Sequence, residues 1–136
     1  MILFIDTSAL LAVLNSADQW HHDARFEWER LLGDGANLVC TDYVLLETLT
    51  LVQSRLGTGA VRLFREEVLP ILTIKWVDVD FFRLGLAALV AADKRSLSLV
   101  DCVSFEVMRA MGLRTAFVFD KHFREAGFEC LPKGKG

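Results

Sequence analysis

The sequence lacks a hydrophobic run long enough to cross a membrane. A transmembrane helix needs about 18 or more apolar residues, whereas the longest apolar run, residues 84–92, contains Gly85 and ends at Asp93. The apolar run at the N-terminus follows no basic segment and is interrupted by Asp6, so no secretory signal peptide is expected. These absences predict a cytoplasmic protein without a membrane segment.

The sequence also has little cysteine and no excess of positive charge. The three cysteines, Cys40, Cys102 and Cys130, form no C-x-x-C motif and lie among apolar residues, which predicts buried free thiols in a reducing compartment. The net charge is −3 at pH 7, so charge alone does not indicate a nucleic-acid partner, although a local basic patch would be enough to bind one.

The chain does have a high apolar content, 53% of its residues, in which short apolar segments alternate with longer amphipathic ones. We expect strands over residues 2–5, 38–40, 71–77, 115–119 and 128–131, and helices over residues 9–15, 19–32, 42–55, 58–69, 81–92, 98–111 and 120–126. This alternation predicts an α/β fold, a three-layer α/β/α sandwich around a doubly wound, mostly parallel sheet of four or five short strands. Residues 71–77 are expected at an edge because Lys75 interrupts them.

The chain contains no internal repeat, low-complexity segment or linker. We therefore expect residues 1–132 to form a single domain, followed by a short basic tail over residues 133–136.

Two acids each end an apolar run. Asp6 follows residues 2–5 and Asp120 follows residues 116–119. Acids at the carboxyl ends of neighbouring parallel strands meet in one crevice, where open α/β sheets bind their ligands. Asp6 has a second interpretation as the N-cap of the following helix.

Two further acids lie on predicted helices. Glu47 sits on a helix that is apolar nearly all round, where a buried unpaired carboxylate would cost several kcal/mol. The alternative is that Glu47 faces a thin polar strip and water. Asp101 follows Ser98 by three residues, which fits a capping box. A helix-start acid can also point beyond the end of the sheet, so capping and function are compatible.

Four converging carboxylates repel one another, and some of them would be protonated near neutral pH unless a cation neutralised them. No His or Cys accompanies them at metal-ligand spacing in the sequence, and ligation by oxygen alone favours Mg²⁺ or Mn²⁺. Such a cluster at a strand-end crevice is typical of phosphoryl chemistry, in which the metal activates water and stabilises charge on phosphate oxygens.

These motifs resemble the PIN domain, and most closely the small single-domain toxins of VapC type. The resemblance covers essentially the whole chain in order and spacing, and it is carried by residues 4–10, Glu47, residues 97–101 with Phe105 and Met108, and residues 117–123.

The resemblance implies that the chain cleaves RNA in a metal-dependent reaction, and that Asp6, Glu47, Asp101 and Asp120 form its acidic site. By analogy, Asp6 and Asp101 would be direct metal ligands, and Asp120 would be a ligand directly or through a water. Glu47 would position or deprotonate the attacking water, or complete the metal shell. Ser8 matches a small polar residue of the family and would orient Asp6 or a water. The resemblance also implies a homodimer and neutralisation by a small antitoxin protein.

Basic residues flank two of the acids and are candidates for binding RNA phosphates; they are Lys94, Arg95, Lys121, His122 and Arg124. Solvated loop charge is the alternative. Two other functions stay open at this point. One is a non-catalytic PIN-like module that binds RNA or protein. The other is a phosphohydrolase of the haloacid-dehalogenase type, although that class needs an acid where Ser8 stands.

Overall fold

The central strand is β1 (Ile2–Ile5), whose last three residues are apolar without alternation and fully buried. The computed structural model describes residues 1–134. It places β1 between β2 (Asn37–Thr41) and β4 (Thr115–Phe117), and all pairings in the sheet are parallel. With β3 (Thr73–Lys75) and β5 (Glu129–Leu131), the strand order is β3-β2-β1-β4-β5. The predicted parallel sheet is confirmed, and β3 does form an edge.

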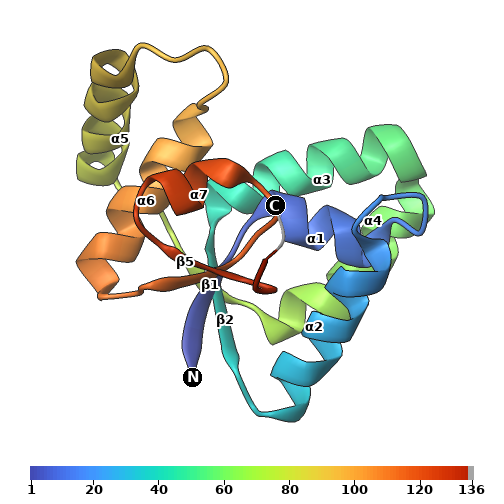
Figure 1. Cartoon of the computed structure of the whole chain (residues 1–136). Coiled ribbons are helices and arrows are strands. Elements are labelled where there is room, and N and C mark those ends of the chain that lie inside the picture. Colours follow the sequence, from blue (N-terminus) through green and yellow to red (C-terminus); the bar gives the residue numbers. More distant parts are fainter. Residues whose placement is uncertain (135–136) are drawn as a thin grey trace.

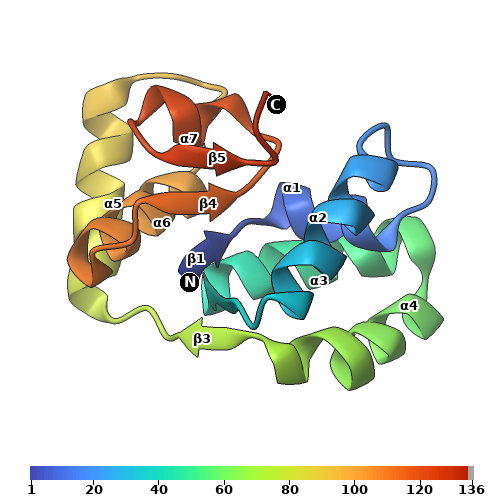
Figure 2. The same ribbon diagram turned by 60° about the horizontal axis from the view of Figure 1, so that its bottom comes forward.

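Helices cover both faces of this sheet (Figures 1 and 2). On one face lie α1 (Thr7–Leu14), α2 (His21–Gly33), α3 (Asp42–Leu56) and α4 (Thr58–Leu63). On the other lie α5 (Val79–Ala92), α6 (Leu99–Met111) and α7 (Lys121–Glu125). The three-layer, doubly wound architecture is therefore confirmed, and the change of face occurs where the chain crosses from β3 to β4.

The predicted helix over residues 58–69 is wrong in its second half. After α4 the chain continues as a π-helical turn (Phe64–Val68) and a short 3₁₀ turn (Leu69–Ile71). Pro70 has no N–H to donate to the preceding turn, which is why a regular helix does not continue through it. The wider turn still buries Phe64 and Val68 in the core.

Other expectations of the sequence hold with small changes of boundary. The first helix begins at Thr7 because Asp6 caps it, and the strands at residues 71–77 and 115–119 are shorter than predicted. All three cysteines are buried free thiols, as predicted. Lys133 and Gly134 of the predicted tail are exposed, whereas residues 135–136 lie outside the described residues. No helix among residues 1–134 is long and apolar enough to cross a membrane.

Candidate active site

The site lies at the carboxyl ends of β1 and β4, where the strand order reverses. Asp6 directly follows β1, and Asp120 follows β4 by three residues. Because β1 and β4 are hydrogen-bonded neighbours, the two acids leave the sheet at the same edge. Such a switch point is where doubly wound sheets bind ligands.

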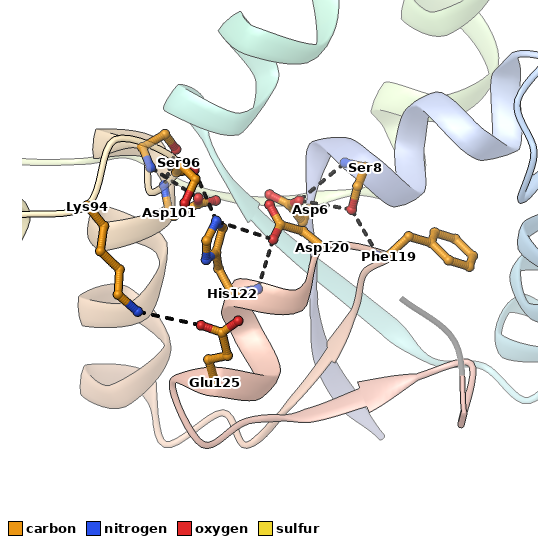
Figure 3. A network of polar contacts seen from close by, with 10 residues as sticks. Asp6, Ser8, Lys94, Ser96, Asp101, Phe119, Asp120, His122 and Glu125 are labelled. Atoms are coloured by element: carbon orange, nitrogen blue, oxygen red, sulfur yellow. Dashed lines mark hydrogen bonds and ion pairs between the residues drawn. The ribbon is translucent and has the colours of Figure 1, made fainter. Parts of the chain in front are cut away.

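All four predicted acids line one cleft of about 280 Å³. Asp6 enters from β1, Glu47 from α3, Asp101 from the first turn of α6 and Asp120 from the start of α7. Asp6, Asp101 and Asp120 point toward one another in Figure 3. The remaining lining residues include three serines and two leucines; they are Thr7, Ser8, Leu11, Leu51, Ser96 and Ser98.

Asp6 caps α1 and faces the cleft at the same time. Its Oδ2 accepts hydrogen bonds from the backbone N–H of Ser8 at 3.2 Å and from the Ser8 hydroxyl at 3.1 Å. The Ser8 hydroxyl in turn accepts a hydrogen bond from the N–H of Phe119 at 3.0 Å. Asp6 Oδ1 is buried and has no hydrogen-bond partner among residues 1–134. The two interpretations of Asp6 are thus compatible, since the cap uses one oxygen and leaves the other to the cleft.

Burial and, to a smaller extent, the charge of Asp101 raise the pKa of Asp6 from 3.8 to about 7, while the hydrogen bonds from Ser8 oppose the shift. The charge of Glu47 acts in the same direction as that of Asp101. A carboxylate that is 4% exposed and faces other acids is unfavourable unless a proton or a cation neutralises it.

Asp101 forms the capping box predicted from its spacing to Ser98. Its N–H donates to the Ser98 hydroxyl at 3.0 Å, and the Ser98 N–H donates to Asp101 Oδ2 at 3.2 Å. Burial raises the pKa of Asp101; the hydrogen bonds from Ser98 lower it, and the charge of Asp120 raises it. The box holds one carboxylate oxygen on the helix terminus and leaves the other available to the cleft.

Glu47 is half-buried and belongs to the cleft wall. Its helix is not buried all round, because Leu46 is 70% exposed. A buried chain of hydroxyls fixes this helix beside Asp6: Thr48 donates to Thr7 at 3.0 Å, and Thr7 donates to the carbonyl of Val44 at 3.3 Å. Since Thr7 follows Asp6 and Thr48 follows Glu47, the contact sets the position of the two acids.

The donors present fit a divalent cation. Asp6 and Asp101 are buried and Asp120 and Glu47 are half-buried, and all four supply oxygen ligands of the kind that Mg²⁺ and Mn²⁺ prefer. The unpartnered Oδ1 of Asp6 supplies a buried acceptor with no donor to satisfy it among residues 1–134, a condition that a bound cation would relieve.

His122 joins this cluster, which its sequence position does not predict. The residue is 8% exposed, and one of its ring nitrogens lies with carboxylate oxygens of Asp101 and Asp120 in a group whose atoms are all within 4.8 Å of one another. Sequence spacing cannot reveal this, because Asp101 and His122 are 21 positions apart and are brought together only by the crossover from α6 through β4. The available signal is the position of His122 two residues after a strand-end acid.

The other four candidate phosphate ligands, Lys94, Arg95, Lys121 and Arg124, are exposed. Lys94 pairs with Glu125 at 3.7 Å, which links the loop before α6 to α7 (Figure 3). His122 differs, because it is buried and its Nε2 lies 3.0 Å from the carbonyl oxygen of Ser96, so it presents little surface to a phosphate.

Comparison with known proteins adds independent information. Residues 3–129 match the PIN domain. Over 128 residues the chain is 33% identical to the 23S rRNA-specific endonuclease VapC20 of Mycobacterium tuberculosis, a match that spans 93% of this chain and 95% of that protein.

Solved structures agree with this match. The crystal structure of M. tuberculosis VapC20, a Sarcin-Ricin loop cleaving toxin, superimposes with a TM-score of 0.80 and covers 94% of this chain and 96% of that one, at 33% identity. The crystal structure of VapBC2 from Rickettsia felis, bound to a DNA fragment from the VapBC2 promoter, superimposes with a TM-score of 0.70. The match is 13% identical and covers 96% of this chain and 97% of that one. At that identity the second match shows a shared fold only.

Proposed function

The chain belongs to the PIN domain family, and from this premise we propose that it is a divalent-metal-dependent endoribonuclease. The observation that carries the proposal is the convergence of Asp6, Glu47, Asp101 and Asp120 on one cleft in a chain 33% identical to a 23S rRNA-specific endonuclease. Membership of this family argues against the alternative of a haloacid-dehalogenase-type phosphohydrolase.

In this proposal Asp6, Asp101 and Asp120 hold Mg²⁺ or Mn²⁺. A cation there supplies Lewis-acid polarisation of the phosphodiester and neutralises charge that develops on its oxygens. Glu47 reaches the same cleft with a half-buried carboxylate and accepts the proton of the attacking water. Ser8 keeps Asp6 oriented through its two hydrogen bonds to Oδ2. Lys94, Arg95, Lys121 and Arg124 provide exposed positive charge for the RNA backbone.

The substrate we propose is large-subunit ribosomal RNA, by extension from the specificity of VapC20. The biological role is that of a toxin acting in the cytoplasm, where ribosomes are, and held in check by a small antitoxin. The protein would act as a homodimer. Apolar side chains exposed on α5 support a protein partner; they are Val79, Leu84, Leu86 and Val90.

The test is to incubate the purified, antitoxin-free protein with isolated ribosomes and with total RNA, with Mg²⁺, with Mn²⁺ and with EDTA. We expect discrete cleavage of the large ribosomal RNA that requires the metal. Asp6→Asn and Asp101→Asn should each lower the rate about 100-fold or more. Asp93→Asn is the matched control, because Asp93 is an exposed acid at the end of α5 that does not line the cleft.

Cleavage that persists in EDTA or in both variants would refute the mechanism. Absence of cleavage of any RNA, with the metal bound, would instead favour a non-catalytic module that binds RNA or protein. Light scattering on the same preparation tests the homodimer, and a monomer at micromolar concentration would contradict it.

A further inference from the structure

The buried side chain of His122 lies beside Asp101 and Asp120, just behind the lining of the four-acid cleft. Its Nε2 lies 4.0 Å from Asp120 Oδ1, and a nitrogen of the ring falls within 4.8 Å of the oxygens of both Asp101 and Asp120. Figure 3 shows the ring between Ser96 and Asp120, with Asp101 beside them. This arrangement places one nitrogen donor among oxygen donors.

The position of His122 is fixed by its backbone as well as by its ring. The backbone N–H of His122 donates to Asp120 Oδ1 at 2.8 Å. Asp120 is the N-cap of α7, so this hydrogen bond also fixes the first turn of the helix that carries the imidazole. The side chain is 9% exposed, and the carbonyl oxygen of Ser96 lies 3.0 Å from Nε2. A ring held in this way has little rotational freedom to lose when it binds a ligand.

The distances suit a single ion. Two ligands of one ion lie about 3.0–4.2 Å apart at the usual metal–oxygen and metal–nitrogen distances near 2.1 Å. The 4.0 Å between Nε2 and Asp120 Oδ1 lies within this range, whereas the 3.0 Å between Nε2 and the Ser96 carbonyl is an ordinary hydrogen-bond distance. The cleft also holds the unpartnered, buried Oδ1 of Asp6.

We propose that His122 is a nitrogen ligand of the metal site, so that this chain prefers Mn²⁺, or another transition-metal ion that accepts imidazole, over Mg²⁺. The proposal refines the function proposed above, and it depends on that function only in assuming that the same site binds a divalent metal ion. Imidazole suits first-row transition metals, whereas Mg²⁺ prefers oxygen ligands. On this proposal the ligand set would include one nitrogen, in place of the ligation by oxygen alone that the sequence predicts.

The tautomer of His122 distinguishes this role from a structural one. If Nε2 carries the hydrogen, it donates to the Ser96 carbonyl and only fastens the loop before α6. If the hydrogen is on Nδ1, Nε2 has a free lone pair for the metal and makes no hydrogen bond to the Ser96 carbonyl. The two tautomers therefore predict different results when the imidazole is replaced by the amide of glutamine.

His122→Gln separates them, because the glutamine amide can still donate to the Ser96 carbonyl but offers no imidazole nitrogen. By calorimetry on the full chain, we expect the affinity for Mn²⁺ to fall about 10-fold and that for Mg²⁺ to change less than about 3-fold. Pulsed electron paramagnetic resonance of bound Mn²⁺ should show coupling to an imidazole nitrogen in the wild type and none in the variant. His21→Gln is the control, because its ring also contacts a backbone carbonyl, that of Ala12 at 2.7 Å, but belongs to no group of candidate metal ligands among residues 1–134.

The proposal would be overturned if bound Mn²⁺ showed no nitrogen coupling, or if the protein failed to bind Mn²⁺ at all. It would also be overturned if His122→Gln lowered the affinities for both ions equally or changed neither. These readouts need no RNA. Metal-dependent cleavage with no nitrogen coupling would leave the proposed nuclease standing and remove the ligand role of His122. Nitrogen coupling in a protein that cleaves nothing would do the reverse.

Discussion

Asp6 shows how a single residue serves both the fold and the site. One of its oxygens is satisfied by Ser8, and the other is buried with no partner among residues 1–134. The capping role is therefore not evidence against a metal role, although the sequence alone sets the two against each other. What separates them is the direction of each oxygen, which a motif does not encode.

Replacing Asp6 with asparagine should stabilise the metal-free protein at high pH. The pKa of Asp6 is raised to about 7, so the native state keeps a proton that the unfolded chain loses near pH 4. Stability is therefore lost as the pH rises through this window. In EDTA at pH 8, Asp6→Asn should be more stable than the wild type by on the order of 2 kcal/mol, and the gap should close toward pH 4. Urea unfolding measures it, and a variant that is less stable at pH 8 would contradict the shift.

Ser8→Ala should damage both stability and activity, because the hydroxyl joins Asp6 to the backbone after β4. Its loss leaves the N–H of Phe119 without its acceptor at 3.0 Å and should cost about 1–3 kcal/mol. Ribonuclease activity should fall by more than the unfolded fraction explains. Ser16→Ala, an exposed position in the loop after α1, is the control for stability and rate. Wild-type stability in Ser8→Ala would show that the contact contributes nothing.

At the scale of elements, α5 packs closely against α6, the helix that carries Asp101. Gly85 of α5 packs against Val103 of α6 so closely that a Cβ at position 85 would lie 2.4 Å from Val103 Cγ2 and 3.1 Å from Val103 Cα. The contact with backbone cannot be relieved by a side-chain rotation alone, so the two helices must separate.

Gly85→Ala should therefore destabilise the protein by about 1–3 kcal/mol even though alanine favours helix. Gly59→Ala is the matched control, since Gly59 lies in α4 and a Cβ added there would meet no described atom within 4 Å; it should be neutral or stabilising by up to about 1 kcal/mol. Denaturant midpoints decide the matter: equal effects of the two substitutions would mean that the close helix contact does not constrain the protein.

The elements themselves are largely predictable, because β1, α3 and α6 carry strong periodic or capping signals in the sequence. The spacing of Ser98 and Asp101 predicts a capping box, and the box forms. Pro70 predicts an interruption but not its geometry, since a widened turn depends on how Phe64 and Val68 reach the core. The burial of His122 is not predictable, because sequence order cannot show that the crossover returns it to Asp101.

At the scale of the molecule, one sheet carries all the elements that build the cleft. The domain prediction for residues 1–132 then requires that the chain unfold in one cooperative step. Far-ultraviolet circular dichroism reports on helices on both faces of the sheet, whereas tryptophan fluorescence reports on the buried Trp28 of α2. If the domain unfolds in one step, the two probes should give coincident denaturation curves. Two separated transitions would indicate that the layers fold independently.

Metal binding should stabilise the whole molecule, and by less at low pH. A ligand that binds only the native state at 100 times its dissociation constant adds about 2.7 kcal/mol. Binding at Asp6 requires its deprotonation, and with a pKa of about 7 the apparent affinity should fall up to tenfold for each pH unit below that value. The increase in Tm caused by saturating Mn²⁺ at pH 8 should therefore shrink at pH 6 at the same ion concentration. Asp6→Asn should abolish most of the increase at both pH values, whereas Asp93→Asn should leave it intact. An increase that does not depend on pH, or that survives in Asp6→Asn, would mean that the stabilising ion binds elsewhere on the protein.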